Sequence, residues 1–98
     1  MEVLINAKYY KGHATLKVGR YGNGSIAIQG FSQCGEPLFK ATVALDELPS
    51  DDCVLLKGWG ENEGIPESLV AAGIVELTGK TIPTGYCEAL EAKLLVEL

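Results

Sequence analysis

The chain has little of the chemistry that most metal proteins depend on. Its 98 residues include one histidine, His13, and three widely spaced cysteines, Cys34, Cys53 and Cys87. A zinc site usually takes four Cys or His ligands, two of them close in sequence, and no Cys-x-x-Cys pair occurs here. We therefore expect no metal ion and no cofactor, and three reduced thiols that pack as small hydrophobic groups.

Motifs for catalysis are also missing. A nucleophile needs a neighbouring base, and His13 is an isolated residue in a turn-like segment. Residues 22–27 read Gly-Asn-Gly-Ser-Ile-Ala, which matches a dinucleotide-binding fingerprint by letter but leads into an alternating strand instead of a helix. The sequence contains neither a Walker loop nor a His-Glu-x-x-His motif. We expect no catalytic residue, and predict that the protein is not an enzyme.

Long apolar runs and a secretory leader are absent too. No run approaches the roughly 18–20 apolar residues that cross a bilayer, and the start of the chain has no basic region followed by an apolar core. The hydrophobic fraction of 47% and the charged fraction of 21% are typical of globular proteins. We expect one ordered domain, residues 1–98, in the cytoplasm and without membrane contact.

Alternation of apolar and polar residues predicts an antiparallel meander over the first 45 residues. Val3, Ile5 and Ala7 alternate with more polar neighbours, and the same pattern recurs at 15–18, 26–29 and 39–45. Asn-Gly at 23–24, between two such segments, is the strongest short-range hairpin signal. Such a meander buries one face and leaves the other in water.

The second half mixes strands with one helix. Residues 53–57 and 74–77 read as strands, 65–73 as a helix, and 78–80 and 82–85 as turns. Pro66 suits the first helical turn and Gly73 suits the C-terminal cap. Ile65, Leu69 and Ala72 recur at helical spacing and form a narrow apolar stripe.

The last segment, 86–98, fits two structures. As a strand it places most of its apolar residues on one face, and as a helix it aligns Leu90, Leu94, Leu95 and Leu98. We prefer the strand because pattern usually outweighs propensity. The predicted fold class is α+β, with an antiparallel β-sheet meander that can curl towards a barrel and one α-helix packed on it.

The charge is unevenly distributed along the chain. Residues 1–45 carry five cations and two carboxylates, whereas residues 46–98 carry three cations and eleven carboxylates. Seven of those eleven surround Trp59: Asp46, Glu47, Asp51, Asp52, Glu61, Glu63 and Glu67. An acidic surface beside an exposed tryptophan can anchor a basic partner. Alternatively, Trp59 packs onto the sheet and the carboxylates keep the protein soluble.

A basic and aromatic set occupies the first half: Lys8, Tyr9, Tyr10, Lys11, His13, Lys17, Arg20 and Tyr21. Interleaved cations and rings can hold phosphates and stack bases. The pI of about 4.7 is far from the basic values usual for nucleic-acid binders, so nucleic acid is the less favoured partner. The favoured interpretation is that the tyrosines cover a sheet edge and the lysines keep that edge soluble.

Several short segments together resemble a known family. They are 21–29 (YGNGSIAIQ), 35–38 (GEPL), 56–64 (LKGWGENEG), 72–75 (AGIV), 78–80 (TGK) and 83–86 (PTGY). Their order is similar to that in an uncharacterised family, a domain of unknown function, of small soluble proteins from bacterial phages and mobile elements. The resemblance implies no activity and no assigned site. It implies a context in which small acidic proteins often inhibit host defence or act as regulators.

These observations lead to two hypotheses on function. The leading one is a non-catalytic protein that inhibits a host defence nuclease in the bacterial cytoplasm, as an anti-CRISPR or anti-restriction protein does. Its carboxylates would take the place of phosphates in a Lys/Arg-lined groove. The partner-binding residues would be Trp59, Glu61, Glu63, Asp51 and Asp52.

The alternative is a nucleic-acid-binding accessory protein that uses the basic strands. Its binding residues would be Lys8, Tyr9, Tyr10, Lys11 and Arg20. Pairing of exposed sheet edges into a homodimer is left open. The leading hypothesis requires the acidic and basic regions to stay apart after folding, because contact between them would neutralise both.

Overall fold

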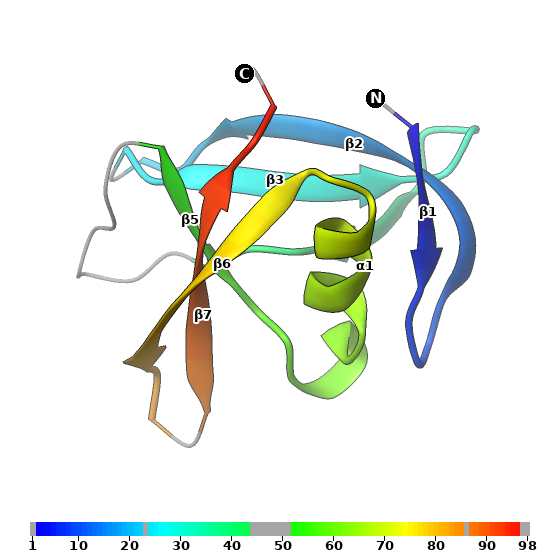
Figure 1. Cartoon of the computed structure of the whole chain (residues 1–98). Coiled ribbons are helices and arrows are strands. Elements are labelled where there is room, and N and C mark those ends of the chain that lie inside the picture. Colours follow the sequence, from blue (N-terminus) through cyan, green and yellow to red (C-terminus); the bar gives the residue numbers. More distant parts are fainter. Residues whose placement is uncertain (1, 23, 44–51, 86, 97–98) are drawn as a thin grey trace.

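A computed structural model of the chain describes residues 2–22, 24–43, 52–85 and 87–96. Within these ranges the chain forms two antiparallel sheets and one short α-helix (Figure 1). The elements are β1 (Glu2–Asn6), β2 (Lys11–Arg20), β3 (Ile26–Phe31), β4 (Pro37–Lys40), β5 (Cys53–Leu56), a 3-10 turn η1 (Gly60–Asn62), α1 (Ile65–Ala71), β6 (Val75–Pro83) and β7 (Glu88–Leu94).

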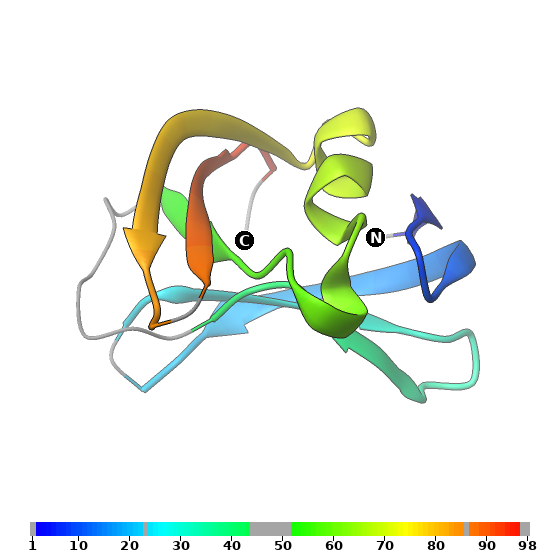
Figure 2. The ribbon, with the colours of Figure 1, turned by 90° about the horizontal axis from the view of Figure 1, so that it is seen from below.

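The predicted α+β class is confirmed in its broad form, but the predicted single sheet is wrong. The first sheet has the strand order β1-β2-β3-β4 and the second has β5-β7-β6, and neither closes into a barrel. Alternation reveals where strands lie but not which strands pair, so it could not divide them between two sheets. Figure 2 shows β2, β3 and β4 as one layer, with β5, β6, β7 and α1 on its inner side.

The first sheet follows the predicted meander. Val3 and Ile5 are buried, and their neighbours on β1 are exposed. The strand β2 pairs with β1 from Lys11 to Thr15 and with β3 from Thr15 to Arg20. One long bent strand thus joins both parts of the sheet, and the predicted hairpin between β2 and β3 is confirmed. Residue 23 of its turn lies outside the described residues.

The sheets meet where the chain leaves β4. A bridge pairs Thr42 with Leu56, and the Lys57 and Val43 amides donate to Ala41 and Leu55 carbonyls at 2.8 and 3.0 Å. Thr42 is buried, and its Oγ1 accepts a hydrogen bond from the Ile28 amide at 3.1 Å. That bond replaces the water that the hydroxyl would otherwise need.

The predicted helix is confirmed as α1, with Pro66 in its first turn and Gly73 at φ 76° just past its C-cap. Ile65 and Leu69 are buried as predicted. Ala72 is exposed instead, because the helix ends at Ala71 and the chain turns away. The helix is bound to β1 through Ser68, whose Oγ accepts from the Asn6 amide and donates to the Gly64 carbonyl, each at 3.0 Å.

The turn predicted at 78–80 is wrong. These residues lie inside the single strand β6, where the register passes from Leu77 opposite Ala92 to Thr81 opposite Leu90. The extra residues bulge out of the ladder, and Thr-Gly-Lys suits a bulge as well as a turn. The predicted C-terminal strand is confirmed as β7, which lies between β5 and β6.

Two apolar clusters hold the described part of the chain together. The larger lies between the sheets and under α1, and includes Ile5, Ile28, Leu56 and Leu69. The smaller consists of Leu55, Ile82 and Ala89 on the other face of the second sheet, with Val43 and Trp59 packed against it. No helix within the described residues is long and apolar enough to cross a bilayer.

Candidate functional site

Trp59 was predicted either to anchor a partner or to pack onto a sheet. It follows β5 and directly precedes η1, and its half-buried ring packs against Leu55, Ile82 and Ala89. The Trp59 ring therefore packs as part of an apolar cluster, and only part of the ring is exposed to a partner.

The predicted acidic contact residues do not converge around Trp59. Asp52 precedes β5, whereas Glu61 and Glu63 follow it, and the four residues of β5 put about 13 Å of strand between the two groups. Asp52 Oδ2 lies 4.0 Å from Lys93 Nζ. Asp51, the remaining residue of the predicted set, lies outside the described residues, as do Asp46 and Glu47.

Within the described residues, the acidic and basic regions are joined by an ion pair between Lys8 and Glu63. Lys8 Nζ lies 3.4 Å from Glu63 Oε2, and the Lys8 amide donates to the Glu63 carbonyl at 2.9 Å. Both side chains of the pair are more than half exposed, so its contribution to stability is small. The contact weakens the leading hypothesis from the sequence, in which carboxylates around Trp59 bind a basic partner (the acidic-surface hypothesis). The charge of Glu63 is already paired with Lys8 and is less available to such a partner.

The residues predicted to bind nucleic acid lie at the two ends of β2. Lys8, Tyr9 and Tyr10 lie in the turn before β2, whereas Arg20 and Tyr21 lie at its far end. The ten residues of β2 span about 30 Å. The residues predicted to bind nucleic acid therefore do not form one site.

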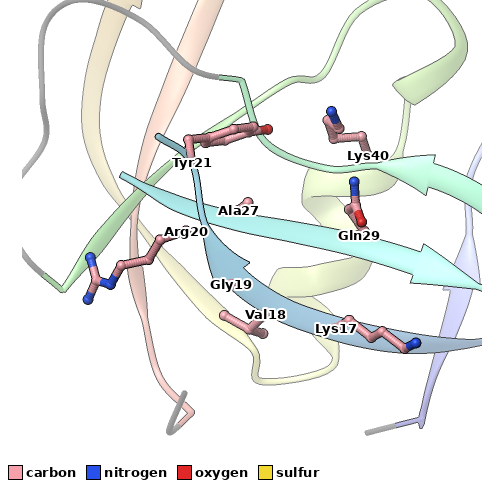
Figure 3. Close-up of a pocket in the computed structure, with 8 residues that line it drawn as sticks. All are labelled: Lys17, Val18, Gly19, Arg20, Tyr21, Ala27, Gln29 and Lys40. Atoms are coloured by element: carbon pink, nitrogen blue, oxygen red, sulfur yellow. The ribbon is translucent and has the colours of Figure 1, made fainter. Parts of the chain in front are cut away.

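A hollow of about 340 Å³ lies on the outer face of the first sheet (Figure 3). Gly19 and Ala27 face each other across β2 and β3 and form its floor, because neither has a side chain that could fill the space. Strand alternation directs Ala14, Leu16, Ile26 and Ile28 into the core, and so directs the residues between them outward.

A polar row crosses three strands at the rim of this hollow. Lys17 on β2 pairs with Gln29 on β3, and Gln29 pairs with Lys40 on β4. Figure 3 shows Gln29 between the two lysines, and both lysines are exposed. The row therefore carries two positive charges on either side of a neutral amide, an arrangement that suits an anion with more than one charge.

Two aromatic rings accompany the lysines. Tyr21 lies at the rim, where its hydroxyl hydrogen-bonds Thr42 Oγ1 at 3.0 Å and Lys40 Nζ lies 5.6 Å from its ring centre. Phe31 extends the same face beyond the hollow, and Lys17 Nζ lies 4.8 Å from its ring centre. Each ring is half-buried and carries an ammonium group over its face, a cation–π arrangement.

We call this surface the basic outer face. Its members are Lys17, Gly19, Tyr21, Ala27, Gln29, Phe31 and Lys40. None of the described residues that line the hollow is a carboxylate. Arg20 points away from the hollow in Figure 3, and its Nη1 donates to the Gly24 carbonyl at 2.7 Å. The charged side chains among the described residues that line the hollow are therefore all cations, although the whole chain carries a net charge of −5.

Sequence reasoning named Lys17 and Tyr21 in a broader set but missed Gln29, Phe31 and Lys40 as partners in a site. Alternation placed Lys17, Gln29 and Lys40 each on the solvent side of its own strand. The missing information was the register that sets them opposite one another. That register would have required the strand pairing to be known in advance.

The described residues contain no group of three or more His, Cys, Asp or Glu side chains that could hold a metal ion. His13 lies on β2, where its Nδ1 is 3.3 Å from Glu2 Oε1 and both side chains are more than half exposed. The Cys53 thiol is buried at the start of β5, and its desolvation, followed by its hydrogen bond to Asp52, raises its pKa. The His13–Glu2 pair and the Cys53 thiol lie in different sheets, so they do not form a common catalytic or metal-binding site.

Comparisons with models of protein families, with curated proteins and with solved structures each found no match, so the resemblance to a phage and mobile-element family remains a prediction.

Proposed function

We propose that this chain is a non-catalytic binding protein whose basic outer face takes up the phosphates of a nucleic acid. One observation carries the proposal. Lys17 and Lys40, on two strands either side of β3, both line a hollow that has a Gly-Ala floor and no carboxylate in its described lining. The predicted acidic contacts do not gather around Trp59. The alternative hypothesis from the sequence therefore becomes the favoured one, with a different set of residues.

The negative net charge does not oppose this binding strongly. The molecule measures 33 × 27 × 22 Å, whereas charges in physiological salt are screened over about 8 Å. The carboxylates of α1, β6 and β7 lie on elements at the inner side of the β2–β4 layer. A phosphate at the hollow thus experiences mainly the local field of the two lysines.

The test is a titration of a fluorescently labelled oligonucleotide by anisotropy, repeated at several salt concentrations. The variant Lys17→Glu/Lys40→Glu is compared with Lys80→Glu/Lys93→Glu, which changes the net charge equally but on β6 and β7. We expect the first variant to bind at least about tenfold more weakly and to lose about 1.4 from the salt slope, since each single-strand phosphate contact adds about 0.7. Equal weakening by both variants, or no binding by the wild type, would overturn the proposal.

The acidic-surface hypothesis remains a second candidate because of two exposed side chains. Glu61 and Glu67 have no ion pair among the described residues, so both are free to meet a basic protein. The test is inhibition of purified CRISPR effectors and restriction nucleases by the wild type and by Glu61→Lys/Glu67→Lys. Inhibition that the reversal abolishes supports this candidate, and inhibition that survives the reversal removes it.

A further inference from the structure

We infer that the nucleic acid is single-stranded, with bases stacked on Phe31 and Tyr21 and phosphates bound by Lys17 and Lys40. The inference rests on the proposed function and names the ligand class of the same surface. Its source is the pairing of each ring with one of the two lysines, at 4.8 Å for Phe31 with Lys17 and 5.6 Å for Tyr21 with Lys40.

In the free protein each lysine covers a ring. An exposed ammonium over a ring is held only weakly, whereas a base stacked on an aromatic side chain is held more strongly. A base can therefore displace the ammonium from the ring. The displaced ammonium then lies next to the backbone of the same nucleotide, where it can donate a hydrogen bond to a phosphate oxygen. The two changes support each other, so ring and lysine act as one unit.

Stacking requires bases whose faces are open. A duplex buries its base faces between neighbouring pairs and offers only phosphates and groove edges to a nearly flat surface. A duplex would therefore engage Lys17 and Lys40 but neither ring. The Gly19–Ala27 floor adds to the preference, because a planar base can approach the sheet where no side chain is larger than a methyl group.

The rings also set the length of the ligand. Phe31 lies opposite Thr15, and Tyr21 directly follows Arg20 at the other end of the shared β2–β3 ladder. Five to six residues of strand separate them, roughly 17–20 Å. This span corresponds to a short footprint, near the lower end of the about 4–16 nucleotides that single-strand-binding barrels cover.

Tyr21 is held in place for this role. Its hydroxyl is bonded to the buried Thr42, at 3.0 Å to Oγ1 and 3.1 Å to the carbonyl oxygen. A ring fixed at its far end loses little side-chain freedom when a base stacks on it, which favours binding.

The experiment compares a labelled twelve-nucleotide thymidine strand with the same strand annealed to its complement, by anisotropy at one low salt concentration. Phe31→Leu removes the ring and keeps an apolar side chain. Tyr9→Leu is the control, because Tyr9 is an exposed aromatic residue that also carries a lysine, Lys8, at 5.3 Å, but lies before β2. We expect Phe31→Leu to weaken single-strand binding at least about fivefold and to leave duplex binding unchanged. We expect Tyr9→Leu to bind both ligands as the wild type does.

Phe31→Trp supplies an independent readout that does not depend on loss of binding. A stacked indole should lose emission when the single strand is added, whereas Trp59 belongs to the smaller cluster on the second sheet and should not respond. Circular dichroism and thermal unfolding establish that each variant is folded.

The possible outcomes separate the two proposals. Equal affinity for single strand and duplex, with no effect of Phe31→Leu, overturns the inference and leaves the proposed function standing. Binding of polyglutamate in place of any oligonucleotide overturns both. Unchanged emission of Phe31→Trp at a saturating strand concentration also overturns the stacking arrangement.

Discussion

The helix can lie against the first hairpin because residue 64 has no side chain. Gly64 has φ 94°, and a Cβ placed on it would stand 2.8 Å from the Cα of Ala7. Two separate requirements, a left-handed backbone and a close approach, therefore select glycine here. The amide of Lys8, next to Ala7, donates to the carbonyl of Glu63, next to Gly64. The glycine at position 64 therefore also allows the basic and acidic regions to come into contact.

Gly64→Ala is expected to destabilise the fold more than Gly73→Ala. Both positions have positive φ, which costs alanine about 1–2 kcal/mol. At Gly73 nothing lies within 4 Å of the added Cβ, whereas at Gly64 the contact with Ala7 adds about 1–3 kcal/mol. Urea unfolding of both variants measures the difference. Equal midpoints would show that the contact with Ala7 carries no cost.

The three thiols are expected to differ in reactivity. Cys34 is exposed and Cys53 is buried, and the raised pKa of Cys53 keeps it in the unreactive protonated form near neutral pH. Labelling with an alkylating reagent at pH 7.5, followed by peptide mass spectrometry, should modify Cys34 first and Cys53 last. Raising the pH should accelerate the labelling of Cys53 only above the pH range in which ordinary thiols ionise. In urea, which unfolds the protein, the three thiols should be labelled at similar rates.

At the scale of elements, β6 is an edge strand with built-in protection. It lies at one side of the second sheet and exposes Leu77, so a straight β6 could pair with another chain. The bulge between Leu77 and Thr81 interrupts the ladder, and Thr78 Oγ1 anchors it to Glu91 Oε1 at 3.0 Å. A bulge bends an edge strand and makes it a poor template for pairing.

Removing the bulge should therefore promote self-association. Deletion of Gly79 and Lys80 removes an even number of residues, so inward and outward faces are preserved while β6 becomes regular. We expect sedimentation velocity to show dimers or larger species for the deletion variant and a smaller species for the wild type. Identical sedimentation of two well-folded proteins would contradict this role of the bulge.

Most elements could be predicted from the sequence because their evidence is local. Alternation at Val3 and Ile5, and Pro66 and Gly73 at the helix ends, each depend on a few neighbouring residues. The errors arose where one signal fits two structures, as with Thr-Gly-Lys at 78–80, or where the end of an element decides, as with Ala72. The candidate site could not be predicted from such local evidence, because Lys17, Gln29 and Lys40 become neighbours only through strand pairing.

At the scale of the whole molecule, the charge asymmetry of the sequence becomes an asymmetry of faces. The basic outer face belongs to the first sheet, whereas the described carboxylates after residue 51 lie on the second sheet, directly before β5, on α1 and on the segment between β5 and α1. The sequence predicted that the two halves differ in charge. It could not show that, among the described residues, they meet where Lys8 approaches Glu63, because that contact depends on how α1 is placed against the first hairpin.

An acidic protein with such a face should bind heparin at low salt in spite of its pI of about 4.7. Lysines that converge on one face bind a polyanion better than the net charge implies. Elution from a heparin column with a salt gradient measures the effect. Lys17→Glu/Lys40→Glu should elute earlier than the wild type, and Lys80→Glu/Lys93→Glu close to it. Passage of the wild type through the column without retention would contradict a functional basic face.

The position of β7 bears on the order in which the protein folds. Every strand of the first sheet pairs with its neighbour in sequence, whereas β5 must wait for β7 near the end of the chain. Local pairing forms quickly, and pairing across a long separation is slow. During synthesis the sheet that bears the basic outer face should therefore assemble while the second sheet still lacks its central strand. Amide protons of β2 and β3 should gain protection in refolding before those of β5.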